Sequence, residues 1–285
     1  MTLTATQPAP KTEAANAQAA SGSSFSAGMK VLPKAERNAM YAIYGFCRIV
    51  DDIADDQQGD RPARAAQLDR WRADLDSLYA GGDPGVAAML VEHVRRFGLR
   101  REDFEAVIDG MAMDVAADIR WPSADMLDLY CDRVASAVGR LSIKIFGMEE
   151  RPGFELAHHL GRALQLTNIL RDIDEDAAIG RVYLPLEAIE AQGIAIGDIT
   201  AVIGDPRIDG AAQMVARQAQ EHFVTAQAIL KARPRGHLIA PKLMAAAYSE
   251  LLRRMRLAGW APPRERVRHN RLALAWTLVK LRLGR

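Results

Sequence analysis

The sequence is poor in cysteine and carries almost no net charge. Of its 285 residues only two are cysteines, Cys47 and Cys131, and both lie in apolar stretches. Two isolated cysteines provide neither a disulfide framework nor a cysteine-rich metal site, so we expect reduced, buried thiols in a cytoplasmic protein. The formal net charge is +1. This balance argues against a protein that binds nucleic acid.

Several common patterns are also missing. No run of about 18 apolar residues is present, so a membrane-spanning helix is not expected. The sequence contains no glycine-rich dinucleotide fingerprint, no Walker loop and no nucleophile elbow, and we therefore expect no dinucleotide-binding subdomain. Sustained alternation of apolar and polar residues is absent too, which argues against strands.

Helical periodicity dominates what remains. Alanine, leucine and arginine are abundant, whereas aromatic residues make up only 6%. The spacing of apolar residues predicts helices over 34–56, 62–80, 85–98, 101–119, 124–147, 154–177, 209–232, 237–259 and 268–283. The longest irregular connection is expected at 192–208. Nothing marks a second domain, so residues 23–285 are predicted to form one all-α bundle.

Residues 1–22 differ from the rest in composition. They are rich in Ala, Thr, Gln and Ser, with no apolar core and no basic start. Such a segment cannot bury enough apolar surface to fold, and it does not have the pattern of a signal peptide. We predict a disordered leader.

Deleting residues 2–20 is expected to leave the thermal midpoint and the activity unchanged, because this composition cannot contribute to a packed core. The two quantities are measured on the shortened and the full-length protein side by side. A large fall in either one would mean that the leader folds over the functional site.

Two acidic motifs about 120 residues apart are the strongest functional signal. The first contains Asp51 and Asp55, and the second contains Asn168, Asp172 and Asp176. The i, i+4 spacing places each set on one face of its predicted helix. Like charges at this spacing destabilise a helix by a few tenths of a kcal/mol, so we expect a cation between them. Hard oxygen ligands favour Mg²⁺, with Mn²⁺ as a substitute, and two facing motifs would hold a diphosphate through several such ions.

Each motif carries its own arginine. Arg48 lies three residues before Asp51, and Arg171 directly precedes Asp172. A guanidinium group in this position can fork onto phosphate oxygens. The alternative is an ordinary ion pair within or between helices, but the recurrence of the arrangement in both motifs favours diphosphate binding.

A third carboxylate pair, Asp114 and Asp118, has the same spacing but no adjacent arginine. It is either part of the site or a structural pair. Aromatic side chains could line the pocket, because their ring faces stabilise a carbocation. Tyrosines on apolar helix faces are also common core residues, so both interpretations stay open for the aromatic residues near the motifs: Tyr41, Tyr44, Phe46, Tyr130 and Tyr248.

Two further segments have unusual faces. The run 134–139 is rich in small residues and places Gly139 inside a helix at a cost of ~1 kcal/mol. Small residues allow close helix contact, or they line a slot for a long, thin ligand. The C-terminal part, from Arg253 to Arg285, is strongly basic with interleaved apolar residues. It predicts either a helix that lies on a membrane surface or a closing helix with a solvated basic rim.

Five segments together resemble the squalene/phytoene synthase family: 23–25, 41–55, 130–139, 164–172 and 180–185. The similarity covers roughly residues 22–270. Within the family, segments 110–114, 132–142 and 158–165 most resemble the bacterial hopanoid-pathway enzymes that make presqualene diphosphate.

The resemblance implies an isoprenoid-synthase bundle with a central pocket. It assigns Mg²⁺–diphosphate roles to Asp51, Asp55, Asn168, Asp172 and Asp176, all of which stand at the family's motif positions. It likewise assigns diphosphate binding to Arg48, Arg171 and Arg266, and pocket positions to Ser24, Phe25, Tyr130, Gln165 and Tyr248. Tyr44 or Tyr248 would relay a proton. Ser26 and Ala27 follow Phe25 where relatives of the subgroup usually carry aromatic residues.

The implied activity is the head-to-head (1'-1) condensation of two farnesyl diphosphates, without NADPH, by an enzyme in the cytoplasm or at the inner face of the membrane. Downstream enzymes of the hopanoid pathway would be partners. Alternatives within the family are squalene, dehydrosqualene and phytoene synthases. Outside it, a terpene cyclase would use one substrate molecule, and a membrane-associated helical scaffold would have no turnover. The intact acidic motifs favour an enzyme, because the family's non-enzymatic members have eroded ones.

Overall fold

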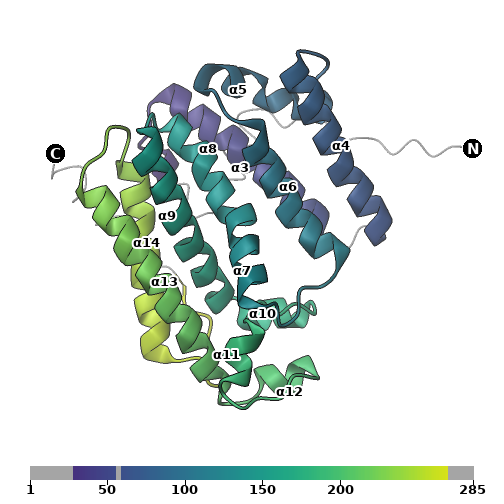
Figure 1. The fold of residues 1–285 in the computed structure, drawn as a ribbon, viewed down its shortest axis with the longest axis vertical. Helices are drawn as coiled ribbons and strands as arrows, with labels where there is room; N and C mark the ends of the chain where they lie inside the picture. The colour runs from purple at the N-terminus through teal and green to yellow at the C-terminus, as the bar shows by residue number, and fades with distance from the viewer. Residues whose placement is uncertain (1–27, 56–58, 269–285) are drawn as a thin grey trace, which may run out of the picture.

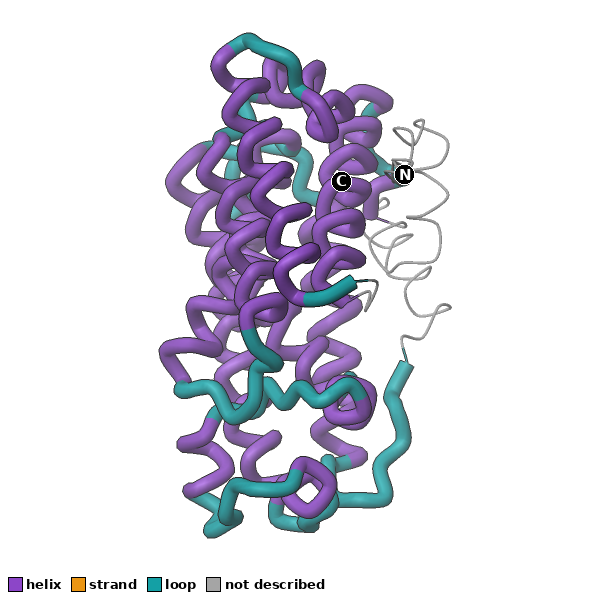
Figure 2. Tube along the Cα trace, turned by 90° about the vertical axis from the view of Figure 1, so that its right-hand side faces the viewer, coloured by secondary structure: helices purple, strands orange, loops and turns teal. Residues whose placement is uncertain are grey.

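The computed structural model describes residues 28–55 and 59–268, and within these ranges no strand occurs beyond an isolated bridge between Arg120 and Val182. Figure 2 shows helices joined by loops throughout. The predicted all-α fold is thus confirmed. No helix in these ranges is long and apolar enough to cross a membrane.

The elements follow one another along the chain with short connections. The first half contains α3 (Lys34–Asp55), α4 (Arg61–Ala80), η1 (Gly85–Leu90), α5 (Val91–Phe97), α6 (Arg101–Ala116) and α7 (Ala124–Cys131). The middle contains the π-helical η2 (Asp132–Ser136), α8 (Ala137–Ile145), α9 (Glu150–Arg171), α10 (Ile173–Ala178), α11 (Leu186–Glu190) and α12 (Ile199–Ile203). The last two are α13 (Ile208–Lys231) and α14 (Ile239–Ala258).

The apolar faces of these helices form two adjoining clusters. One gathers buried residues of α3, α4, α6 and α8, and the other gathers those of α9, α13 and α14. The helices α8 and α9 lie side by side in the middle of the bundle (Figure 1) and join the two clusters. The short helices α10, α11 and α12 gather at one end of the bundle.

Helix boundaries agree with the predicted ranges where capping residues are present. Asp60 begins α4 by accepting a hydrogen bond from the amide of Ala63, and Gly81 ends the helix in the left-handed conformation. Ser123 caps α7 by accepting from the amide of Met126. Short polar side chains at N-caps and a glycine at the C-terminus stabilise helix ends in this way.

Five predicted ranges differ from the structure. The predicted helix 85–98 is divided into η1 and α5 at Val91. The predicted helix 101–119 ends at Ala116, and 154–177 is divided into α9 and α10 around Asp172. The range 192–208 contains the short helix α12, and 124–147 consists of three consecutive elements. The predicted leader 1–22 and nearly all of the predicted helix 268–283 lie outside the described residues.

The interruption of 124–147 coincides with a buried polar network. The guanidinium of Arg162 on α9 donates to both carboxylate oxygens of Asp128, to Asp132 and to the hydroxyl of Ser136. Arg140 bonds Asp132 from the other side and also bonds Asp103. A buried arginine needs this many partners. Because Asp132 and Ser136 bound the π-helical turn, the network is the contact that holds η2 against α9.

The small residues of 134–139 and their partners allow two close backbone contacts. A Cβ atom at Gly161 of α9 would lie 2.7 Å from the main chain of Ser136, and one at Gly139 would lie 3.0 Å from the Cβ atom of Ala157. Both glycines are therefore required by close approach of α9 to η2 and α8.

Candidate functional site

Carboxylates from three helices converge at one end of the bundle. Asp51 and Asp55 come from the last turns of α3, Asp114 comes from α6, and Asp176 comes from α10. The charges of Asp55 and Asp114 both raise the pKa of Asp51, and they also raise that of Asp176. The two acidic motifs, about 120 residues apart in sequence, thus lie near enough for their charges to interact.

Arg181 connects two of these helices. Its guanidinium bonds the carboxylate of Asp55 at 2.5 Å and the carbonyl of Ala54 at 3.1 Å, and it lies 3.9 Å from Asp114. Asp114 is only 3% exposed and also accepts hydrogen bonds from the hydroxyls of Tyr130 (3.1 Å) and Tyr183 (2.8 Å). The cationic side chain of Arg181 therefore partly offsets the repulsion between the carboxylates.

Asp172 of the second motif is held by two arginines. Arg171 bonds both of its carboxylate oxygens, and Arg266, from the segment after α14, bonds one of them and also approaches Glu175 at 3.1 Å. The backbone bends at Asp172, although its amide still bonds Asn168 and its carbonyl still accepts from Asp176. The helix predicted to carry Asn168, Asp172 and Asp176 on one face therefore bends at Asp172, the central residue of the three.

Arg48 pairs within its own helix, with Asp51 at 2.9 Å and Asp52 at 2.7 Å, and its side chain is half exposed. Before a ligand binds, all three predicted diphosphate arginines thus form ion pairs with nearby carboxylates. Such pairs are weak where they are exposed to solvent, and they can exchange for phosphate oxygens.

The electrostatics of the cluster follow from burial and charge. Burial and then the charge of Asp55 raise the pKa of Asp51 to about 6, while burial and then the charge of Asp172 raise that of Asp176 to about 7. Burial also raises the pKa of Asp114. Burial opposes ionisation of Asp172, but the hydrogen bonds from its two arginines outweigh it and lower its pKa. Several carboxylates here therefore hold protons more tightly than they would in water.

An apolar cavity of about 250 Å³ adjoins the carboxylates. Its lining comes from α3, η2, α8, α9 and the start of α14, and includes Met40, Tyr44, Cys47, Val134, Ala135, Val138, Gly139, Phe146, Leu160, Gly161, Gln165, Asn168, Ala240 and Met244. The small residues of 134–139 therefore serve both functions that the sequence suggested. They permit close helix contact and they line the slot.

The cavity and the carboxylates lie along the same helix faces. On α3 the lining residues Met40, Tyr44 and Cys47 are followed at the same helical spacing by Asp51. From Met40 to Asp51 the helix rises by roughly 16 Å. On α9 the lining residues Gly161, Gln165 and Asn168 lead in the same way to Asp172. The slot thus leads from an apolar interior to a charged end.

Asn168 lies where the cavity meets the second motif. Its side-chain oxygen Oδ1 is buried and has no hydrogen-bond partner among the described residues. A buried amide oxygen without a partner costs about 1–3 kcal/mol. The amide oxygen of Asn168 and the carboxylates of Asp172 and Asp176 in the same motif are hard oxygen donors, which fit Mg²⁺.

The other predicted site residues have different surroundings. Tyr130 stacks on Tyr183 at 4.9 Å between ring centroids and contacts Asp114. Tyr248 is buried and interacts with Arg171. Phe46 is fully buried between Trp71 and Phe104. The cavity-wall interpretation of Phe46 is therefore wrong, because its ring faces the core.

Other predictions also change. Tyr41 packs against the core and does not line the cavity. Asp118 lies beyond the end of α6 and pairs with Arg61 at 3.0 Å, so it does not share a helix face with Asp114. Ser24 and Phe25 lie outside the described residues. Burial raises the pKa of both Cys47 and Cys131 to about 12, and neither forms a disulfide.

Sequence reasoning missed Arg181 and Tyr183 as site residues. They lie in the irregular segment between α10 and α11, so no helical spacing relates them to the acidic motifs. The only sequence signal was the resemblance of segment 180–185 to the family.

Comparison with known proteins agrees with this geometry. The chain is 59% identical to the presqualene diphosphate synthase of Zymomonas mobilis, over 94% of this chain and 92% of that protein. It is 51% identical to the presqualene diphosphate synthase of Rhodopseudomonas palustris, over 90% and 91%. Among solved structures, squalene synthase HpnC from Alicyclobacillus acidocaldarius superposes with a TM-score of 0.74 at 28% identity, covering 84% of this chain and 89% of that one.

The sequence model of squalene/phytoene synthases matches residues 18–273, which include both acidic motifs, all of α3 to α14 and Arg266. With this match over most of the chain, and with relatives more than 50% identical over nine-tenths of it, the protein belongs to the squalene/phytoene synthase family.

Proposed function

We propose that the protein is a presqualene diphosphate synthase that condenses two molecules of farnesyl diphosphate. The observation that carries this proposal is the slot that runs along α3 and α9 from an apolar interior to the facing carboxylates. Such a slot suits a substrate with a long hydrocarbon chain and an anionic head. The two relatives above, both presqualene diphosphate synthases, support the choice of product.

The diphosphate end is the place for Mg²⁺, for which Mn²⁺ would substitute. Asp51, Asp55, Asn168, Asp172 and Asp176 would hold it, and the unpartnered Oδ1 atom of Asn168 supports that set. When bound, the metal supplies positive charge that favours departure of the diphosphate.

The arginines act on the same group. Arg48, Arg171 and Arg266 would leave their present carboxylate partners and donate to phosphate oxygens. Arg181 stays between Asp55 and Asp114 and keeps these two carboxylates in place. The protein thereby holds the leaving group through charge-assisted hydrogen bonds, which are stronger than neutral ones.

The cavity protects the reacting hydrocarbon. Loss of diphosphate from one farnesyl chain leaves an allylic cation, and its C1 atom bonds to the 2,3 double bond of the second chain. Loss of a proton then closes a cyclopropane ring, and the second diphosphate stays on the product. The apolar lining excludes water that would quench the cation. The departing diphosphate takes the proton, with the cavity residue Tyr44 or the neighbouring Tyr248 as relay.

We place the reaction in the cytoplasm, with peripheral contact at the inner face of the membrane, where the product, a long hydrocarbon with a diphosphate head, is passed on to enzymes of hopanoid synthesis. Part of the basic C-terminal region is already neutralised. Arg264 bonds Asp174, and Arg253 bonds Glu250. A membrane contact would therefore depend on the other basic residues of this region, the exposed Arg256 among them.

The expected product is a cyclopropyl diphosphate, formed with one diphosphate released per two substrates. Purified protein is incubated with Mg²⁺ and farnesyl diphosphate, with and without NADPH, and the extracted lipids are analysed by mass spectrometry after phosphatase treatment. NADPH is expected to change little, because no hydride-donor site is recognisable in the sequence.

Three outcomes of this experiment would contradict the proposed reaction. Complete conversion to squalene by the purified protein with NADPH would identify a squalene synthase, and a hydrocarbon of unchanged chain length would identify a terpene cyclase. Absence of diphosphate release with intact protein would favour the non-catalytic scaffold.

A further inference from the structure

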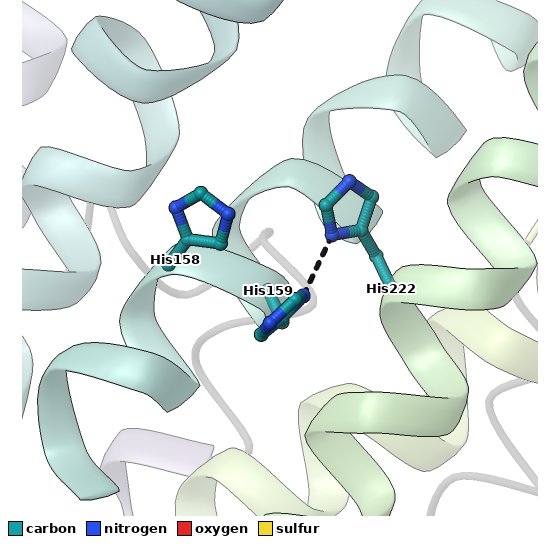
Figure 3. Close-up of side chains that lie close together, drawn as sticks. All are labelled: His158, His159 and His222. Atoms are coloured by element: carbon teal, nitrogen blue, oxygen red, sulfur yellow. Dashed lines mark hydrogen bonds between the residues drawn. The ribbon is translucent and has the colours of Figure 1, made fainter.

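Three histidines form a cluster away from the carboxylates. His158 and His159 lie on α9, and His222 lies on α13, the helix that packs beside α9 (Figure 3). Their ring centroids are 4.8, 5.1 and 5.9 Å apart, and one ligating atom from each lies within 4.8 Å of the others. None of the three lines the cavity or belongs to the carboxylate motifs.

The three imidazoles lie close enough together to share one metal ion, and two of them, His159 and His222, are hydrogen-bonded to each other. The Nδ1 atoms of His159 and His222 are 2.9 Å apart. A tetrahedral Zn²⁺ with bonds of 2.0–2.1 Å separates its nitrogen ligands by roughly 3.3 Å. Two of the three nitrogens are thus already near the required spacing. His158 is exposed, and one of its ring nitrogens lies within 4.8 Å of a ring nitrogen of each of the other two histidines.

The charges around the cluster permit a cation. Arg162 donates to Nδ1 of His158 at 2.8 Å, but its own charge is balanced by Asp128 and Asp132. If His158 turns toward a metal, Arg162 keeps these two carboxylates and the hydroxyl of Ser136.

We propose that His158, His159 and His222 form a Zn²⁺ site that joins α9 to α13, with solvent as the fourth ligand. Imidazole nitrogens suit Zn²⁺ and the neighbouring transition metals, whereas Mg²⁺ prefers oxygen. The site is therefore chemically distinct from the diphosphate end. Because the metal binds the folded state through residues of two helices, it stabilises their association.

Zn²⁺ binding is measured by calorimetry on protein without a polyhistidine tag, stripped with EDTA and returned to excess Mg²⁺ to occupy the carboxylates. We expect one tight equivalent of Zn²⁺ per chain and a rise of about 5 °C in thermal midpoint at 100 times the dissociation constant. Co²⁺ should give the strong visible absorption of a four-coordinate ion. His159→Ala and His222→Ala should lose all three signals.

His237→Ala is the matched control, because His237 is an exposed histidine outside the cluster, and it should bind as the wild type does. His158→Ala changes an exposed residue and tests the third ligand even if the other variants fold poorly, as judged by circular dichroism. Unchanged Zn²⁺ binding in both His158→Ala and His222→Ala, or no binding to the wild type, would overturn the proposal. No substrate is present, so either result leaves the proposed condensation untouched.

Discussion

Replacing Asp51 or Asp172 by asparagine is expected to lower the turnover of farnesyl diphosphate by at least ~10²-fold. Each change removes one negative charge from the group of carboxylates that faces the cavity, where it would hold the ion that stabilises the leaving diphosphate. The measurement is steady-state kinetics at saturating Mg²⁺, with diphosphate release as the readout.

Asp52→Asn is the matched control. Asp52 is adjacent to Asp51 and also pairs with Arg48, but it does not share the helix face of Asp51 and Asp55. Its loss should change turnover by less than about 10-fold. Rates close to wild type in both Asp51→Asn and Asp172→Asn, with the helical content intact by circular dichroism, would refute the metal–diphosphate site.

Replacing Asp176 by asparagine is expected to stabilise the metal-free protein at pH 8 and to have little effect below pH 4. The folded-state pKa of Asp176 is raised to about 7, so the folded protein retains a proton that the unfolded chain has lost above pH ~4. Stability therefore falls as pH rises from about 4 to 7, and the full penalty, roughly 2–4 kcal/mol, is present above pH 7. Asparagine removes it.

The measurement is the thermal midpoint in EDTA at a series of pH values, wild type against variant. Wild type and variant are compared at the same pH because His158, His159 and His222 also make stability depend on pH. Below pH ~6.5 their effect is opposite in sign to that of Asp176. With their pKa values lowered on folding, they stabilise the protein as pH rises toward that value. Asp205→Asn serves as control, since Asp205 lies outside the carboxylate cluster. A midpoint at pH 8 that is lower in Asp176→Asn than in the wild type would contradict the expected repulsion.

Local patterns predicted the parts of the site that depend on a single helix. The spacing of Asp51 and Asp55 placed both on one face of α3, and the structure has that helix within one residue of its predicted end. The order of the main helices followed from apolar periodicity for the same reason, because each buries one continuous stripe.

The parts of the site that the sequence did not predict depend on contacts between distant segments. No local signal tells that Arg181 reaches Asp55, 126 residues earlier, or that Asp114 would be enclosed by Tyr130 and Tyr183. Likewise Tyr44 and Phe46 are two residues apart in the same apolar stretch. The ring of Phe46 packs in the core against Trp71 and Phe104, whereas that of Tyr44 lines the cavity, and no local pattern distinguishes the two.

The close contact of α9 with η2 and α8 makes one stretch of the slot rigid. Where Gly161 meets Ser136, the wall is main chain, and main chain cannot widen by changing rotamer as side chains do. The opposite end is lined by Met29, Met40 and Met244, whose unbranched side chains repack readily. We therefore expect the slot to accept a longer isoprenoid chain, against the methionine side chains, more readily than a thicker one, against the main chain.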